Sequence, residues 1–238
     1  QYQCYSRHSK KAEAAEIITE QFDSMTMENS MKPESLLDRV ATVALKSNTE
    51  VAINTETLEN VLSTAKKYNM KLRGHCLVWH SQTPSWFFKE NYTGNKDVSK
   101  DVMTARMENY IKTVMTYCQT KYPGVVYAWD VVNEAMSDGG GDANGYRNAG
   151  SNWYTIYQDG SFIEKAFEFA AKYRAEGVKL FYNDYNEYAP AKRDHIYNMA
   201  KNLYDKGYLD GIGMQSHYSM DYPNTELVEA AIKKYASI

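Results

Sequence analysis

Short apolar runs alternate with longer amphipathic stretches along nearly all of the 238 residues, and this alternation limits the fold most strongly. Apolar residues that recur every three to four positions predict helices, and continuous apolar runs bounded by turn residues predict buried strands. The predicted helices are residues 10–20, 34–46, 57–68, 99–121, 162–176, 191–206 and 225–235. The predicted strands are residues 22–26, 71–79, 125–132, 178–182 and 211–215. Strands that alternate with helices favour the α/β class with a parallel sheet.

The sequence predicts one domain, residues 1–238, because nothing in it resembles a linker, an internal repeat or a low-complexity segment. With 43% hydrophobic residues the chain can bury a full core. A net charge of -3 gives no basic surface for nucleic acid, and no apolar run approaches the roughly 20 residues of a membrane span. Cys4, Cys76 and Cys118 lie far apart, which indicates unpaired thiols or at most one bridge, and no zinc site.

Each predicted strand is followed at its carboxyl end by polar and aromatic residues. In a parallel sheet these ends meet at one edge and form a cleft with many hydrogen-bonding partners. The residues concerned are Glu28, Asn29, His75, Trp79, His80, Gln82, Asn133, Glu134, Asn183, Asp184, Tyr185, Gln215 and His217. The chain also has 21 tyrosines and 4 tryptophans, which stack on the apolar faces of sugar rings but serve protein interfaces equally well.

Taken singly, several of these residues have a structural interpretation. A lone histidine near a strand, such as His75 or His217, is commonly a hydrogen-bonded core residue. Trp79 fits a core position, Lys32 fits a surface cation, and Asp184 fits a turn. The repetition of such residues at the same end of five strands favours a functional cleft.

The segment from Trp129 to Ala135 is a short apolar run that ends in the pair Asn133-Glu134. It predicts a strand that delivers a carboxyl group to the edge where parallel barrels keep their catalytic residues. A carboxyl group held there among aromatic and amide neighbours is well placed to donate a proton near neutral pH. The alternative to a catalytic role is that Glu134 is only a solvent-exposed acidic residue at the end of a strand.

Five segments together resemble glycoside hydrolase family 10, the endo-1,4-β-xylanases, and they occur in the order of that family. They are residues 27–33 (Met-Glu-Asn-Ser-Met-Lys-Pro), 73–82 (Arg-Gly-His-Cys-Leu-Val-Trp-His-Ser-Gln), 129–135, 182–186 (Tyr-Asn-Asp-Tyr-Asn) and 211–218 (Gly-Ile-Gly-Met-Gln-Ser-His-Tyr). The resemblance implies a (β/α)8 TIM barrel. It also implies a secreted retaining enzyme that hydrolyses internal β-1,4 bonds of xylan, with no cofactor and no metal.

The resemblance implies a role for each matching residue. Glu134 is similar to the general acid/base, and Asn133 to the asparagine that binds the sugar 2-hydroxyl. Gln215 and His217 match the pair beside the nucleophile, and Tyr185 matches a tyrosine near the cleavage point. The contacts on the glycone side are implied to be Glu28, Asn29, Lys32, His75, Trp79 and Gln82. A cis peptide bond is implied between His75 and Cys76.

The chain departs from the family at its two ends. It is expected to cover roughly helix 1 to helix 6 of the barrel and to lack strands 1, 7 and 8, with strand 1 expected just before Gln1. The family's nucleophile motif, of the type Thr-Glu-Leu-Asp, occurs nowhere in the sequence and is expected beyond Ile238. Two open sheet edges suggest that further sequence, a complementary fragment or a second copy completes the barrel.

Other carboxylates are weak substitutes for the missing nucleophile. A retaining mechanism needs two carboxyl groups ~5.5 Å apart across the sugar, and Glu187, Asp130 and Asp184 are the candidates that the sequence offers. Without the nucleophile, His217 lacks the carboxylate that it orients. The alternatives are therefore a catalytically dead xylan-binding fragment or pseudoenzyme, and a scaffold protein with no sugar site.

Overall fold

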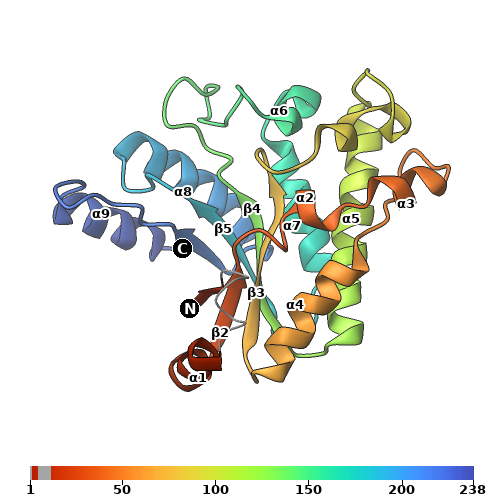
Figure 1. Cartoon of the computed structure of the whole chain (residues 1–238). Coiled ribbons are helices and arrows are strands. Elements are labelled where there is room, and N and C mark those ends of the chain that lie inside the picture. Colours follow the sequence, from red (N-terminus) through yellow and green to blue (C-terminus); the bar gives the residue numbers. More distant parts are fainter. Residues whose placement is uncertain (1, 5–11) are drawn as a thin grey trace.

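Six parallel strands form a single sheet in the order of the chain. The computed structural model describes residues 2–4 and 12–238. The strands are β1 (Tyr2–Cys4), β2 (Ser24–Met27), β3 (Lys71–Trp79), β4 (Val126–Asn133), β5 (Lys179–Asp184) and β6 (Gly211–Met214). Each strand pairs in parallel with the next one along the chain. The sheet curves as part of a TIM barrel does, which confirms the predicted α/β fold (Figure 1).

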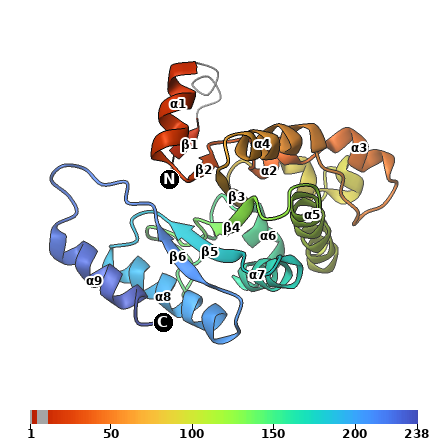
Figure 2. The same ribbon diagram turned by 90° about the horizontal axis from the view of Figure 1, so that it is seen from below.

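The outer face of the curved sheet is covered by α4 (Thr55–Lys67), α5 (Lys100–Lys121), α7 (Ser161–Tyr173), α8 (Pro190–Asp205) and α9 (Thr225–Tyr235) (Figure 2). The described residues also form α1 (Ala12–Gln21), α2 (Pro33–Leu36), α3 (Arg39–Ala44) and α6 (Asn152–Tyr157), with the 3-10 turns η1 (Ser85–Phe88) and η2 (Glu90–Tyr92). Side-chain caps set where three of the longer helices begin. Asn54, Ser99 and Asn224 each accept a hydrogen bond from the backbone N–H three residues later.

The core lies between the sheet and these outer helices. Leu72, Trp129 and Leu180 of the sheet and Met115 and Phe167 of the helices are each 2% exposed or less. A close fit at Trp129 explains a glycine in the neighbouring strand. A β-carbon on Gly74 would lie 2.2 Å from the Trp129 ring, so only glycine leaves room for that indole.

The prediction that strand 1 precedes Gln1 is wrong, because β1 occupies Tyr2–Cys4 and pairs with β2. Residues 2–4 and 12–238 therefore contain six strands, where the sequence predicts five. A segment of three residues is too short to show the apolar alternation or apolar run that identifies a strand. Its place is defined by backbone hydrogen bonding to the edge of β2.

The predicted helix at residues 34–46 is two helices. The chain is extended at Leu37, after α2, and Asp38 then caps the start of α3 by accepting a hydrogen bond from the backbone N–H of Ala41. Leu37 also forms an antiparallel bridge with Ile53, which stabilises the extended backbone between α2 and α3. Helix α6, by contrast, follows a glycine-rich loop and is not predicted at all.

Cys76 and Cys118 are free and buried, as predicted for unpaired thiols. Burial raises the pKa of the Cys118 thiol to about 12.

In the part of the chain that the structure describes, no helix combines the length and the apolar character needed to span a bilayer.

Candidate active site

A cleft of about 510 Å³ lies at the carboxyl ends of the strands. Its lining comes from the ends of β2 to β6 and the turns that follow them. The lining residues are Thr26, Lys32, Arg73, His75, Trp79, Asp130, Asn133, Glu134, Asn183, Gly213, Met214, Gln215 and His217. The fold thus brings seven of the predicted site residues into one cleft, and the parallel sheet is the reason, since it places all these strand ends along one edge.

The carboxyl group of Glu134 is held by donors from two other strands. Trp79, at the end of β3, donates from Nε1 to Oε2 at 2.9 Å. Gln215, directly after β6, donates from Nε2 to Oε1 at 2.9 Å and to Oδ1 of Asn133 at 3.1 Å. Both donors are neutral, so they orient the carboxyl group without adding a positive charge beside it.

Lys32 forms the centre of a second cluster in the cleft. Its Nζ donates to Oε1 of Gln82 at 2.7 Å and to Oδ1 of Asn29 at 3.0 Å, and it lies 4.8 Å from the centroid of the Trp79 ring. Gln82 also donates to Asn29 at 3.2 Å. The side chain of Lys32 is buried, with 8% of the residue exposed. The cluster therefore presents a cation, two amides and an aromatic face together, which suits the hydroxyls and apolar face of a sugar.

Asp130 is a buried carboxylate with two basic partners. His75 contacts its Oδ2 through Nδ1 at 2.8 Å, and Arg73 donates from Nε to Oδ1 at 2.7 Å. Burial alone would raise the pKa of Asp130, but the hydrogen bond from His75 and the charge of Arg73 together hold it below its ordinary value. Asp130 thus fixes His75 at the floor of the cleft.

Three predicted residues lie less centrally. Glu28 is partly buried in the turn after β2 and is outside the cleft lining. His217 lines the cleft with an exposed side chain. The hydroxyl of Tyr185 accepts a hydrogen bond from Nη2 of Arg147 at 3.0 Å.

The bond between His75 and Cys76 is a cis peptide, as predicted from the family resemblance.

Among the described residues, Asp130 and Glu134 are the carboxylates that line the cleft. The side chains of Glu187 and Asp184 are engaged elsewhere. Glu187 is fully buried and accepts from the Tyr218 hydroxyl at 2.8 Å, while Asp184 pairs with Lys192 at 2.9 Å. Since Asp130 is bonded to His75 and Arg73, none of these three has the features of an exposed nucleophile.

The sequence predicts no supporting role for two residues that shape the site. It offers Asp130 only as a weak substitute nucleophile, although an acidic residue inside an apolar strand is a usable signal, because a buried carboxylate requires partners. Arg147 gave no signal, because it lies in a loop rich in glycine and asparagine whose path back to the cleft is set by tertiary structure. In the described part of the chain, no cluster of three or more His, Cys, Asp or Glu residues could hold a metal ion.

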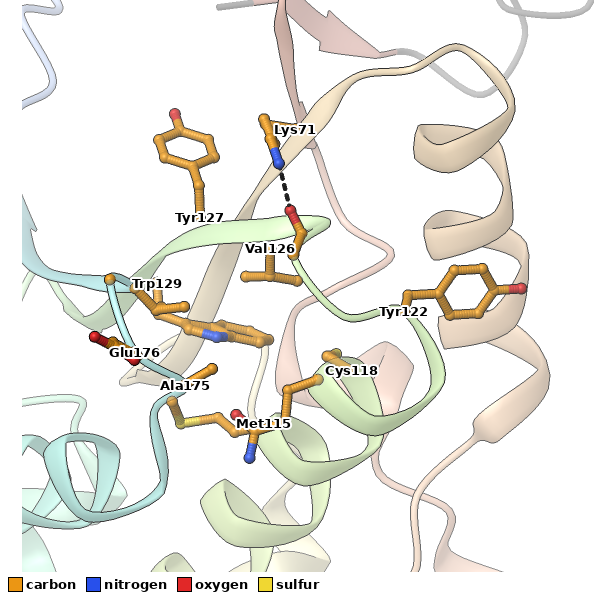
Figure 3. Close-up of a pocket in the computed structure, with 13 residues that line it drawn as sticks. Lys71, Met115, Cys118, Tyr122, Val126, Tyr127, Trp129, Ala175 and Glu176 are labelled. Atoms are coloured by element: carbon orange, nitrogen blue, oxygen red, sulfur yellow. Dashed lines mark hydrogen bonds between the residues drawn. The ribbon is translucent and has the colours of Figure 1, made fainter.

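A second hollow, of about 270 Å³, lies at the opposite, amino ends of β3, β4 and β5 (Figure 3). Trp129, Met115 and Cys118 form its apolar side, and Lys71 closes one end by donating to the carbonyl oxygen of Gly124 at 2.6 Å. This end of a TIM barrel generally serves stability, and catalytic groups gather at the other end.

The sequence model described as "Glycosyl hydrolase family 10" matches residues 3–238. The chain belongs to glycoside hydrolase family 10. It is 44% identical over 225 residues to the bifunctional endo-1,4-β-xylanase XylA of Ruminococcus flavefaciens, a match that covers 94% of this chain and 23% of that protein. It is also 44% identical over 235 residues to endo-1,4-β-xylanase Y of Acetivibrio thermocellus, covering 93% and 21%.

Solved structures of family 10 xylanases are also similar to this chain. The GH10 and CBM22-1 modules of a Clostridium thermocellum endo-1,4-β-D-xylanase, complexed with xylohexaose, align with a TM-score of 0.86 and 42% identity. That alignment covers 93% of this chain and 45% of the solved chain. An intracellular xylanase of Thermoanaerobacterium saccharolyticum aligns with a TM-score of 0.82 and 34% identity, covering 98% and 68%. The family 10 chain thus spans less than a quarter of the first two curated relatives.

Proposed function

We propose that this family 10 chain belongs to a retaining endo-1,4-β-xylanase in which Glu134 is the general acid/base. The observation that carries the proposal is the position of the Glu134 carboxyl group, at the carboxyl end of β4 and between the Trp79 and Gln215 donors. The xylanase names of the relatives and the xylohexaose bound to a similar structure support xylan as the substrate.

The proposed reaction has two steps. In the first, the Glu134 carboxyl group gives its proton to the bridging oxygen as the bond from C1 to that oxygen breaks, and a second carboxylate bonds to C1. The family resemblance assigns that carboxylate to sequence following Ile238. In the second step Glu134, now a carboxylate, takes a proton from water while the water oxygen bonds to C1 and releases the nucleophile.

The other cleft residues would bind the sugar chain. Asn133, hydrogen-bonded to Gln215 at 3.1 Å, would contact the 2-hydroxyl, a bond that strengthens as C1 gains positive charge. Tyr185 and His217 would lie near the cleavage point. The proposed glycone contacts are Glu28, Asn29, Lys32, His75, Trp79 and Gln82.

The Glu134→Gln variant tests the proposal, because it keeps the size of the side chain and removes the acid. In the full-length protein that carries this chain, we expect turnover of xylan to fall by about 10²–10⁴-fold while binding of xylohexaose is largely kept. Reducing ends released from xylan measure the first quantity and titration calorimetry the second. Glu176→Gln, at the opposite end of the sheet, is the control, and an unchanged rate for Glu134→Gln would overturn the assignment.

A second candidate function is xylan binding without cleavage. The observation in its favour is that, within the described residues, Asp130 is the one carboxylate besides Glu134 in the cleft lining, and His75 and Arg73 engage it. Binding of xylohexaose together with no release of reducing ends from the full-length protein would favour this candidate.

We further propose that the protein acts outside the cell, because intact xylan is too large to enter one. A similar solved structure is that of an intracellular xylanase, so the location of this protein needs a direct test. Detection of the protein in the culture medium of intact cells tests this, and its confinement to the cell pellet would indicate that shorter xylo-oligosaccharides are the substrate.

A further inference from the structure

The backbone turns sharply where Glu134 leaves β4. Glu134 has φ of 56°, in the left-handed region that residues other than glycine rarely adopt. Such a conformation persists only where the surroundings hold it. Because the side-chain direction follows from the backbone, whatever holds this turn also aims the Glu134 carboxyl group into the cleft.

The N–H side of the turn is held by β5. The N–H of Glu134 donates to the carbonyl oxygen of Asn183 at 2.8 Å. The N–H groups of Ala135 and Met136 both donate to the buried hydroxyl of Tyr182, at 3.0 and 3.2 Å. Backbone and side-chain groups of β5 therefore accept the hydrogen bonds of the N–H groups in the turn.

Arg147 holds the carbonyl side of the same turn. Its Nε donates to the oxygen of Glu134 at 3.0 Å and its Nη2 to the oxygen of Met136 at 3.1 Å. The backbone N–H of Arg147 donates to the oxygen of Ala135 at 2.8 Å. Arg147 thus holds three successive carbonyl groups, two of them through a planar guanidinium whose fork geometry lysine cannot reproduce.

Arg147 also connects this turn to a second candidate site residue. Its Nη2 donates to the Tyr185 hydroxyl at 3.0 Å. Burial would lower the pKa of Arg147, but the hydrogen bond to Tyr185 and the charges of Asp184 and Asp138 outweigh it, so the guanidinium stays charged. In the described structure Arg147 has no carboxylate within ion-pair distance, and its side-chain hydrogen bonds go to neutral oxygens beside Glu134.

We propose that Arg147 is a positioning residue, which aims the Glu134 carboxyl group at the glycosidic oxygen by holding the carbonyl side of the turn. This inference rests on the proposed function. It assigns a catalytic consequence to a loop residue whose side chain hydrogen-bonds the backbone oxygens of Glu134 and Met136 and the Tyr185 hydroxyl.

The test compares two substrates that differ in their need for an acid. Cleavage of xylohexaose requires protonation of the leaving sugar, whereas an aryl xylobioside with a dinitrophenyl leaving group departs without a proton. For Arg147→Met in the full-length protein, we expect kcat/KM on xylohexaose to fall by about 10–100-fold, as for a catalytic group displaced by about 1 Å. On the aryl xylobioside we expect a loss of under about threefold, because this substrate needs no proton in the step that kcat/KM reports.

Two further variants keep the result decisive. Arg147→Lys keeps the positive charge but cannot bind the oxygens of Glu134 and Met136 together. We expect kcat/KM to fall on xylohexaose and not on the aryl xylobioside, by less than in Arg147→Met. If Arg147→Met does not fold, the two rates of Arg147→Lys test the proposal. Arg174→Met removes a comparable arginine, which bonds Val178 and Asp210 at the opposite end of the sheet, and should leave both rates unchanged.

The outcomes separate this inference from the proposed function. Equal losses on both substrates, or no loss on either, would overturn the positioning role while the xylanase assignment stands. If the unmodified full-length protein cleaves neither substrate, the proposed function fails and this inference fails with it.

Discussion

Lys32 is a nearly buried cation whose hydrogen-bond acceptors are neutral amides. A buried ammonium group is costly unless charges or strong hydrogen bonds offset its lost hydration. Here the offset comes from Gln82, Asn29 and the face of Trp79, and in the described structure no carboxylate lies within ion-pair distance. Because no carboxylate among the described residues neutralises it, the Lys32 ammonium group still attracts the oxygens of a ligand. We therefore expect Lys32 to contribute more to ligand binding than to the stability of the fold.

Replacing Lys32 with methionine should therefore weaken sugar binding more than folding. A hydrogen bond from a charged group contributes about 1.5–3 kcal/mol, so we expect the Kd for xylobiose to rise by about 10–100-fold in Lys32→Met. The change in the free energy of unfolding should stay within about 1 kcal/mol, because methionine fills the same volume and leaves no buried charge unpaired. Calorimetry and urea titration measure the two, with Lys89→Met as a control remote from the cleft.

Asp184 shows how one buried carboxyl group can make stability depend on pH. Burial raises its pKa from 3.8 to about 6, although Lys192 and the Tyr182 hydroxyl act in the opposite direction. Between pH 4 and 6 the folded state then binds more protons at this site than the unfolded state. The free energy of unfolding contributed by Asp184 must fall as pH rises through this range.

The Asp184→Asn variant isolates that contribution from those of other carboxylates. A pKa that rises from 3.8 to about 6 corresponds to about 3 kcal/mol, so the stability of the wild type relative to Asp184→Asn should decrease by up to that amount between pH 4 and 7. Urea unfolding of both proteins at four pH values measures the difference. A difference that is constant with pH, or that grows as pH rises, would contradict the raised pKa.

At the scale of elements, helix α6 is the clearest case of structure that depends on distant residues. Trp153, 1% exposed, packs edge-on against Phe88 with ring centroids 5.0 Å apart and stacks on Phe162 at 6.1 Å. Its Nε1 donates to the carbonyl oxygen of Trp79 at 3.1 Å. The short helix thus anchors the end of β3, where Trp79 contacts Glu134.

Trp153→Ala should destabilise the fold by about 3–5 kcal/mol, the usual cost of removing a large buried aromatic side chain. Trp153→Phe keeps most ring contacts and loses the hydrogen bond to Trp79, so we expect a cost of about 1 kcal/mol for that loss. Urea unfolding followed by circular dichroism measures both. The control is Tyr204→Phe, at a residue that is 51% exposed, which should change stability by no more than about 0.5 kcal/mol.

The elements that the sequence predicted well are those whose signals are local. The bounds of strand β4 are predicted within one residue because the strand is an apolar run interrupted only by Asp130, and those of α5 because Ser99 caps its start. Helix α6 spans six residues and β1 three, both too short for a period to emerge, so contacts with other segments decide them. The same division holds in the site: Glu134 was predictable from its position after a strand, whereas Arg147 depends on how a long loop folds back.

At the scale of the whole molecule, the cleft joins parts of the chain that are far apart in sequence. Trp79 from β3, Glu134 from β4 and Gln215 after β6 form one hydrogen-bonded group across the sheet. A sugar chain bound in the cleft would contact strands from β2 to β6 together. Binding of this kind requires the folded sheet, because the unfolded chain cannot bring these groups to one place.

A ligand that binds only the folded state must stabilise it by mass action, by about 2.7 kcal/mol at a concentration of 100 times its Kd. We therefore expect xylohexaose to raise the Tm of the full-length protein in proportion to the logarithm of its concentration, and maltohexaose, with α-1,4 bonds, to leave Tm unchanged. The shift should shrink at equal xylohexaose concentration in Lys32→Met, since that variant loses affinity while keeping the sheet. A Tm that does not respond to xylohexaose at any concentration would favour a scaffold without a sugar site, because occupancy of a cleft built from five strands cannot leave the folding equilibrium unaffected.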